Sequence, residues 1–175
     1  MLTGRIWKYG DHVNTDLIIP GRYLDDYDAA SLAAHAMEDI DPQFAGAVRK
    51  GDIIVAGRNF GCGSSREQAP LALKAAGVGA VVAGSVARIF YRNCINIGLP
   101  VIICKEAASM FDAGDTAEID LSGGTIRNAG AGKCARFDPL PDFLLEILEE
   151  GGLVHFMKDR LARERTRPST GPAER

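Results

Sequence analysis

The densest set of chemically capable groups in the chain lies in a glycine-rich stretch, residues 57–68 (GRNFGCGSSREQ). It follows an apolar run and precedes a helical pattern, which is where open α/β sheets bind ligands. Closely spaced glycines, here Gly61 and Gly63, let backbone amides approach an anion. Arg66 adds a forked donor that suits a carboxylate. The stretch therefore predicts an anion-binding loop.

The same stretch excludes two common nucleotide-binding loops, because it lacks the GK[ST] of a Walker A motif and the spacing of GxGxxG. The role of its serines stays open. Ser65 and Gln68 match a capping box, in which the serines only begin a helix. Pro70 would remove an early helical hydrogen bond if Ser65 were the cap, which favours a helix start near Gln68 and leaves the serines in the loop.

A cysteine enzyme and a metal protein are both disfavoured. Cys62 lies among amides that could lower the pKa of its thiol, but the three histidines are scattered and none is spaced to act as its base. The four cysteines form no CxxC pair and have no nearby histidine, so we expect no metal site made by this chain alone. They are Cys62, Cys94, Cys104 and Cys134.

Composition indicates one ordinary globular domain. The chain has 175 residues, of which 46% are hydrophobic and 25% charged. A net charge of −3 offers no broad basic surface, so nucleic acid is an unsuitable main partner. The longest nearly apolar stretch, residues 77–87, is shorter than the roughly 20 residues that span a bilayer. The first ten residues lack the apolar core of a signal peptide, and we therefore expect a cytoplasmic protein.

Alternating apolar strands and helices predict a parallel sheet that is buried on both faces. The expected strands are 4–9, 53–57, 80–85 and 100–104, and the expected helices are 29–37, 67–77, 86–98 and 141–150. Short alternating segments at 116–121, 124–128 and 133–137 predict an added antiparallel region, and so two β layers. We expect one domain over residues 1–159 and a frayed, arginine-rich tail over residues 160–175.

Three long segments resemble the small subunits of the 3-isopropylmalate dehydratase family, which is similar to the swivelling C-terminal domain of aconitases. The segments are GDHVNTDLIIPGRYL, GDIIVAGRNFGCGSSREQAP and ARIFYRNCINIGLPV. They occur in order, and the resemblance covers about residues 4–105. It implies an α/β fold of three layers, β/β/α.

The resemblance also implies an activity. The family is made of hydro-lyases that isomerise a 2-hydroxy acid through dehydration and rehydration, with leucine biosynthesis as the expected pathway. The [4Fe-4S] cluster of the family belongs to a large subunit, so this chain would bind no cofactor and would complete the site of that partner in a heterodimer or heterotetramer. The expected substrate is 3-isopropylmalate. Homoaconitate, citramalate or citraconate, and 2,3-dimethylmalate remain alternatives, as does a non-catalytic anion-binding module.

The resemblance assigns roles to residues of the glycine-rich stretch. Ser64 matches the catalytic serine that removes the proton next to a carboxylate. Ser65 and Arg66 match residues that bind the substrate carboxylate. A serine alkoxide persists only among preorganised donors, for which the amides of Gly61 and Gly63 and the Arg66 cation are candidates.

Two further segments complete the expected site. Asp16 matches a supporting loop acid, although it could equally be a turn acid bonded to its own backbone. The segment that faces the variable part of the substrate comprises Arg22, Tyr23, Leu24, Asp25 and Asp26. Members specific for isopropylmalate often carry an arginine directly after the Tyr-Leu pair, where this chain has two acids. Because such acids would repel an anionic substrate, we expect them to face solvent or a cationic group of the partner.

Overall fold

The structure is a computed structural model that describes residues 1–25 and 27–166, without the side chains of residues 164–166. The strands are β1 Leu2–Lys8, β2 Ile53–Ala56, β3 Ala80–Ala83, β4 Val101–Ile103, β5 Thr116–Asp120, β6 Thr125–Asn128 and β7 Cys134–Arg136. The helices are α1 Thr15–Ile18, the 3-10 helix η1 Gly21–Tyr23, α2 Ala29–Ala34, α3 Phe44–Ala47, α4 Gln68–Ala76, α5 Arg88–Asn96, α6 Ala107–Met110, α7 Asp142–Glu149 and α8 Leu153–Thr166.

The strands form one seven-stranded sheet in the order β4-β3-β2-β1-β5-β6-β7. Strand β1 joins its two halves. The second half of β1 pairs in parallel with β2, whereas its first half, Leu2 to Arg5, pairs antiparallel with β5. The predicted parallel and antiparallel regions are therefore the two ends of a single sheet.

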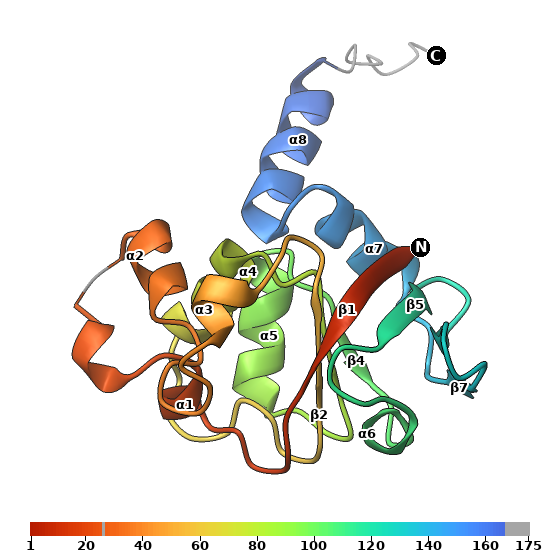
Figure 1. Ribbon diagram of the computed structural model, residues 1–175. Coiled ribbons are helices and arrows are strands. Elements are labelled where there is room, and N and C mark those ends of the chain that lie inside the picture. The colour runs from red at the N-terminus through yellow and green to blue at the C-terminus, as the bar shows by residue number, and fades with distance from the viewer. Residues whose placement is uncertain (26, 167–175) are drawn as a thin grey trace, which may run out of the picture.

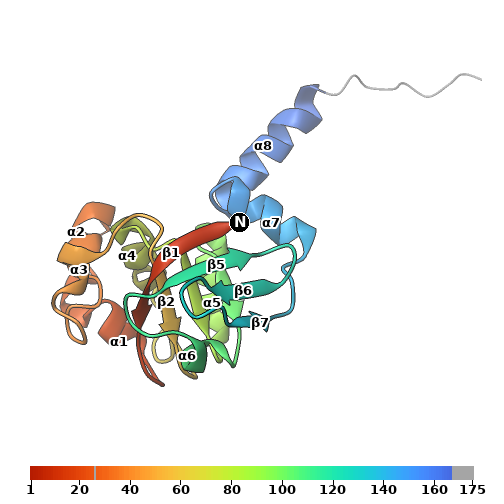
Figure 2. The ribbon, with the colours of Figure 1, turned by 45° about the vertical axis from the view of Figure 1, so that its right-hand side comes forward.

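Two separate apolar cores give the molecule three layers. Strands β2 and β3 are buried at every position, so each strand contributes side chains to both faces of the sheet. One face packs against helices α1 to α5 in a core that includes Ile54, Val81 and Leu73. The other face packs against β5 and β6 through residues such as Val55 and Ile119. The expected β/β/α fold is confirmed, and Figure 2 shows the antiparallel strands in front of the parallel ones.

Most helix limits follow from local signals. Asp28 caps α2 as expected, because its side chain accepts a hydrogen bond from the Ser31 amide. Helix α2 ends at Ala34, with His35 as its C-cap, rather than at the expected Met37. Met37 could not belong to the helix, because its φ of 62° lies in the left-handed region. Helix α4 ends at Gly77, which adopts the left-handed conformation typical of a C-terminal cap.

Helix α8 stands away from the body of the molecule (Figures 1 and 2). The arginine-rich tail was expected to begin at residue 160, whereas α8 continues to Thr166. The rest of that tail, residues 167–175, lies outside the described residues. Within residues 1–25 and 27–166, no helix combines the length and the hydropathy needed to cross a bilayer.

A buried carboxylate ties β1 to the turn that precedes β2. Asp52 is only 4% exposed. Its Oδ2 atom accepts hydrogen bonds from Trp7 Nε1 at 2.8 Å, Arg5 Nη2 at 2.9 Å and the Arg49 amide at 3.0 Å. Burial disfavours the charged form of Asp52, but these bonds outweigh that effect and hold the pKa of the carboxyl below its usual range.

We expect Asp52→Ala to lower the free energy of unfolding by about 2 kcal/mol, because it leaves the Trp7 and Arg5 donors without their buried acceptor. The pKa of Asp52 is lower in the folded state, so its contribution is complete above the unfolded pKa of about 3.9 and is lost as the pH falls further. Urea unfolding from pH 7 to pH 3 measures both effects. Asp112→Ala, in the exposed ion pair with Lys8, is the control and should change little. If the difference in the free energy of unfolding between wild type and Asp52→Ala stayed constant over this pH range, the lowered pKa of Asp52 would be contradicted.

Candidate functional site

The glycine-rich loop lies at the carboxyl edge of the parallel strands, beside the segment that follows β1. The two segments pair through their backbones: the Gly61 amide donates to the Val13 carbonyl at 2.8 Å, and the Thr15 amide donates to the Cys62 carbonyl at 2.8 Å. Residues far apart in the chain therefore meet where open α/β sheets bind ligands.

Gly61 gives the loop its shape. Its φ is +71°, and a Cβ atom added there would lie 2.2 Å from Cγ of Phe90 in α5. Only glycine fits this position. Because the Gly61 amide is bonded to Val13, it is not free to hold an anion, and we correct the expected role of Gly61 from amide donor to loop geometry. Gly63, at φ +96°, is exposed, and its amide has no acceptor among the described residues.

The serines lie in the loop and not in a helix cap. Helix α4 begins at Gln68, and no side chain caps it. The capping box with Ser65 is not formed, since the Gln68 side chain donates to the Leu24 carbonyl at 3.2 Å instead. Both Ser64 and Ser65 are exposed, and neither hydroxyl has a hydrogen-bond partner in the part of the chain that the structure describes.

Thr15 fixes the position of the first serine. Its buried hydroxyl donates to the Ser64 carbonyl at 3.2 Å, so the side chain of one segment holds the backbone of the other. Sequence reasoning missed Thr15. The sequence offered one indication of its importance: Thr15 directly precedes Asp16 in the segment GDHVNTDLIIPGRYL, which resembles the family.

Arg66 and Asp16 form an ion pair between the two segments. Arg66 Nη1 lies 2.5 Å from Asp16 Oδ1 and 3.4 Å from the Ile19 carbonyl. The Arg66 side chain is 15% exposed and that of Asp16 58%. In the described chain, Nη2 and Nε of Arg66 have no acceptor, so the guanidinium keeps donors for a ligand. Asp16 thus pairs with another segment, unlike a turn acid bonded to its own backbone.

The side chain of Arg22 is engaged within this chain. It forms ion pairs with Glu38 and with Asp39, the latter at 2.8 Å. The hydrogen bond from Arg22 holds the pKa of Asp39 below its usual range. The ring of Tyr23 stacks on His35 at a centroid distance of 3.8 Å. The start of the expected specificity segment is thus fixed against the end of α2.

After Tyr23, the segment passes from a held residue, Leu24, to an exposed one, Asp25. Leu24 is held by the hydrogen bond from Gln68, which gives that glutamine a role the sequence did not suggest. Asp25 is exposed, and this agrees with the expectation that it faces solvent. Asp26 lies outside the described residues. The next residue, Tyr27, is an exposed large side chain.

The cysteines of the chain are separated by the fold. Cys62 is half-buried in the glycine-rich loop, Cys94 is in the core under the helices, and Cys104 is in the core between the β layers. Cys134 is exposed on β7, and all four are free thiols. No three His, Cys, Asp or Glu side chains of the described residues gather in a way that could hold a metal ion.

Comparison with known families gives a match to one domain. Residues 11–106 match the model of the aconitase C-terminal domain family. The match begins in the segment after β1, includes the glycine-rich loop and ends after β4. It therefore contains both halves of the Arg66–Asp16 ion pair.

Comparison with curated proteins finds relatives along most of the chain. The methanogen homoaconitase small subunit of Methanothermobacter thermautotrophicus is 61% identical over 159 residues, which are 90% of this chain and 92% of the relative. The 3-isopropylmalate dehydratase small subunit of Nautilia profundicola is 55% identical over 161 residues, 92% of this chain and 96% of the relative. The crystal structure of 3-isopropylmalate dehydratase from Methanocaldococcus jannaschii superposes with a TM-score of 0.88 at 47% identity, covering 95% of this chain and 99% of that one.

The packing of Gly61 against Phe90 leads to a stability prediction. We expect Gly61→Ala to lower the free energy of unfolding by about 2–4 kcal/mol. An alanine is strained in the left-handed conformation of this residue, and its Cβ would clash with the buried Phe90 ring. Gly132→Ala is the matched control, because Gly132 has φ +67° but no atom within 4 Å of an added Cβ. It should lose only about 1 kcal/mol. Equal losses in urea unfolding would show that the contact with Phe90 is not tight.

Proposed function

Because the chain belongs to the aconitase C-terminal domain family, among the small subunits of 3-isopropylmalate dehydratases and homoaconitase, we propose that it is a 3-isopropylmalate dehydratase small subunit. The enzyme would be a hydro-lyase that interconverts 3-isopropylmalate and 2-isopropylmalate by dehydration and rehydration, a step of leucine biosynthesis. One observation carries this proposal: at the carboxyl edge of the sheet, two exposed serine hydroxyls with no hydrogen-bond partner among the described residues directly precede the largely buried Arg66.

The exposure of the serines supports a site that is shared with a large subunit. A serine hydroxyl in open water is too weak a base to take a proton from carbon, and a covered site with fixed donors is needed. A large subunit seated over the carboxyl edge would exclude water from Ser64. When bound there, its [4Fe-4S] cluster would act as a Lewis acid on the hydroxyl group that leaves.

Residues of the two joined loops have separate roles in the proposed reaction. Arg66 binds a substrate carboxylate through Nη2 and Nε, while Asp16 holds Nη1 and fixes the guanidinium plane. The Ser65 hydroxyl and the Gly63 amide add hydrogen bonds to the same carboxylate. Ser64 Oγ takes the proton from the carbon next to that carboxylate and returns it, on the other carbon, during rehydration.

The charges of the specificity segment favour a substrate with an uncharged alkyl group. Arg22 is neutralised by Glu38 and Asp39, and the exposed Asp25 carries a negative charge. A further carboxylate on the variable arm of the substrate, as in homoaconitate, would need a cation, and Arg22 of this segment is already paired with Glu38 and Asp39. The homoaconitase alternative is supported by the 61% identical relative, and the assay below separates the two.

We also propose a cytoplasmic location. All four cysteines are free, and Cys94 and Cys104 are buried in separate cores where no disulfide joins them. Free thiols of this kind suit a reducing compartment. Burial raises the pKa of the Cys94 thiol and keeps it unreactive.

Anaerobic turnover tests the proposed function. The chain, alone and mixed with a cluster-loaded large subunit, is assayed with 3-isopropylmalate, homoaconitate, citraconate and dimethylmaleate. We expect turnover only in the mixture, with 3-isopropylmalate preferred. Ser64→Ala should abolish it while the subunits still assemble, and Ser122→Ala, in a distant turn, should have no effect. Substantial activity of Ser64→Ala would remove Ser64 from the role of base, and stable assembly without turnover of any acid would refute the proposed reaction.

The role of Arg66 gives a kinetic prediction. Arg66→Lys keeps the charge but cannot form a two-pronged contact with a carboxylate while it is also bonded to Asp16. We expect KM to rise about tenfold or more, which corresponds to the loss of one charge-assisted hydrogen bond. Steady-state kinetics of the assembled enzyme measures it. An unchanged KM would contradict the assignment of Arg66 to substrate binding.

A further inference from the structure

Residues 19–24 bend around the guanidinium of Arg66. The Ile19 carbonyl lies 3.4 Å from Arg66 Nη1. Gly21 follows two residues later, and a Cβ atom added to it would lie 3.7 Å from Arg66 Nη2 and 3.7 Å from Asp16 Oδ1. Nη2 is one of the two atoms to which we assign a substrate carboxylate. The backbone of Gly21 therefore borders the place where that carboxylate would bind.

The missing side chain of Gly21 is not required by the fold. The backbone of Gly21 is not left-handed, and the atoms nearest to an added Cβ atom are at ordinary van der Waals distance. An alanine is therefore tolerated here, unlike at Gly61. Because Gly21 is exposed, a methyl group would instead fill accessible space beside Nη2 of Arg66. The glycine thus favours access of a ligand to the guanidinium.

The other end of this stretch is held by the start of α4. The buried side chain of Gln68 donates from Nε2 to the Leu24 carbonyl at 3.2 Å. Gln68 follows Arg66 by two residues, so this bond ties the stretch to the part of the chain that carries the guanidinium. Between the two ends, Arg22 and Tyr23 are fixed against residues that follow α2. The position of the stretch relative to Arg66 is therefore fixed from both sides.

We propose that residues 19–24 form one wall of the carboxylate site at Arg66. Gly21 is a substrate-binding residue of this wall, because it leaves room for the carboxylate. Gln68 is a positioning residue, because it sets how far the wall stands from the guanidinium. The proposal rests on the proposed function, since it takes Arg66 as the group that binds the substrate. Neither Gly21 nor Gln68 is among the site residues that the sequence predicted.

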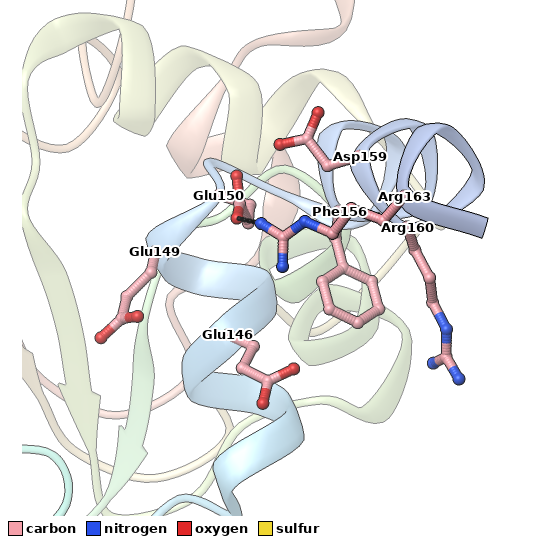
Figure 3. A pocket seen from close by; sticks show the side chains of 7 residues that line it. All are labelled: Glu146, Glu149, Glu150, Phe156, Asp159, Arg160 and Arg163. Carbon is pink, nitrogen blue, oxygen red and sulfur yellow. Dashed lines mark ion pairs between the residues drawn. The ribbon is translucent and has the colours of Figure 1, made fainter. Parts of the chain in front are cut away.

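A hollow between α7 and α8 offers no comparable site for a carboxylate. It measures about 410 Å³, and its lining includes four acids and two arginines (Figure 3). One of these arginines, Arg163, already lies 3.7 Å from Glu150. Because the acids outnumber the arginines, an anionic substrate would be repelled there.

Amide hydrogen exchange of the chain alone tests the role of Gln68 without reference to activity. The amides of Tyr23 and Leu24 donate to carbonyls within the wall. Gln68→Met removes the donor to Leu24 and keeps the length of the side chain, so we expect both amides to exchange about fivefold faster. Gln43→Met makes the same change at an exposed glutamine and should leave both rates unchanged. Equal rates in wild type and Gln68→Met would overturn the positioning role.

Steady-state kinetics of the assembled enzyme tests the role of Gly21. We expect Gly21→Ala to raise KM about tenfold and to keep kcat within about twofold of wild type, and Gly21→Val should raise KM further. Gly10→Ala is the matched control, because Gly10 has no positive φ and no atom lies within 4 Å of an added Cβ atom there. It should keep the KM of wild type.

Two results would overturn the role of Gly21. One is an unchanged KM in Gly21→Ala. The other is a loss of stability in urea unfolding as large as that expected for Gly61→Ala, which would make Gly21 a residue of backbone geometry.

Substrate preference separates the two residues of the proposal. Gly21→Ala should raise KM for every acid that is turned over, because every acid carries the carboxylate. Gln68→Met should instead lower the preference for 3-isopropylmalate over citraconate about fivefold, because it frees Leu24 at the start of the part of the segment that faces the variable arm. An unchanged preference in Gln68→Met would overturn the positioning role. A wild-type enzyme that turns over no acid would refute the proposed function and the role of Gly21 with it, whereas hydrogen exchange would still decide the role of Gln68.

Discussion

The backbone pairing between residues 12–15 and residues 60–63 is the constraint on which the candidate site depends. Two hydrogen bonds, from Gly61 to Val13 and from Thr15 to Cys62, join loops that follow neighbouring strands. Once these loops are joined, Asp16 and Arg66 are close enough to form an ion pair, although 50 residues separate them in the chain. The requirement for glycine at position 61 follows from the same pairing, which presses the loop against α5.

The charged group of the site is held by hydrogen bonds, whereas its candidate reacting groups are exposed. Arg66 is nearly covered and has two acceptors, whereas the serine hydroxyls are exposed and have none among the described residues. A binding group gains from preorganisation, because the cost of ordering it has been met in folding. A reacting group must still be reached by its substrate and then be closed off from water. This division is expected of half a site that is completed by another protein.

Local patterns were sufficient to predict much of the fold. The continuous apolar runs of β2 and β3 identified buried parallel strands, and Asp28 and Gly77 marked helix limits. The Pro70 argument correctly placed the serines in the loop. The contacts of side chains over long separations could not be predicted: the hydrogen bond from Gln68 to Leu24 and the ion pairs of Arg22 depend on how separate elements pack. The role first given to the Gly61 amide failed for the same reason, since its acceptor lies 48 residues away.

The placement of β1 has a consequence for how the chain is made. This first strand is the shared centre of the sheet, and its neighbours β2 and β5 begin about 50 and 115 residues later. During synthesis the two edges of β1 therefore stay uncovered until β2 and β5 have been made. Contacts of such long separation slow folding and prolong the exposure of strand edges, which favours aggregation of the nascent chain. The pairing of β1 with β5 therefore needs residues that follow helices α1 to α5 in the chain, so these helices are made before β1 can be covered on both edges.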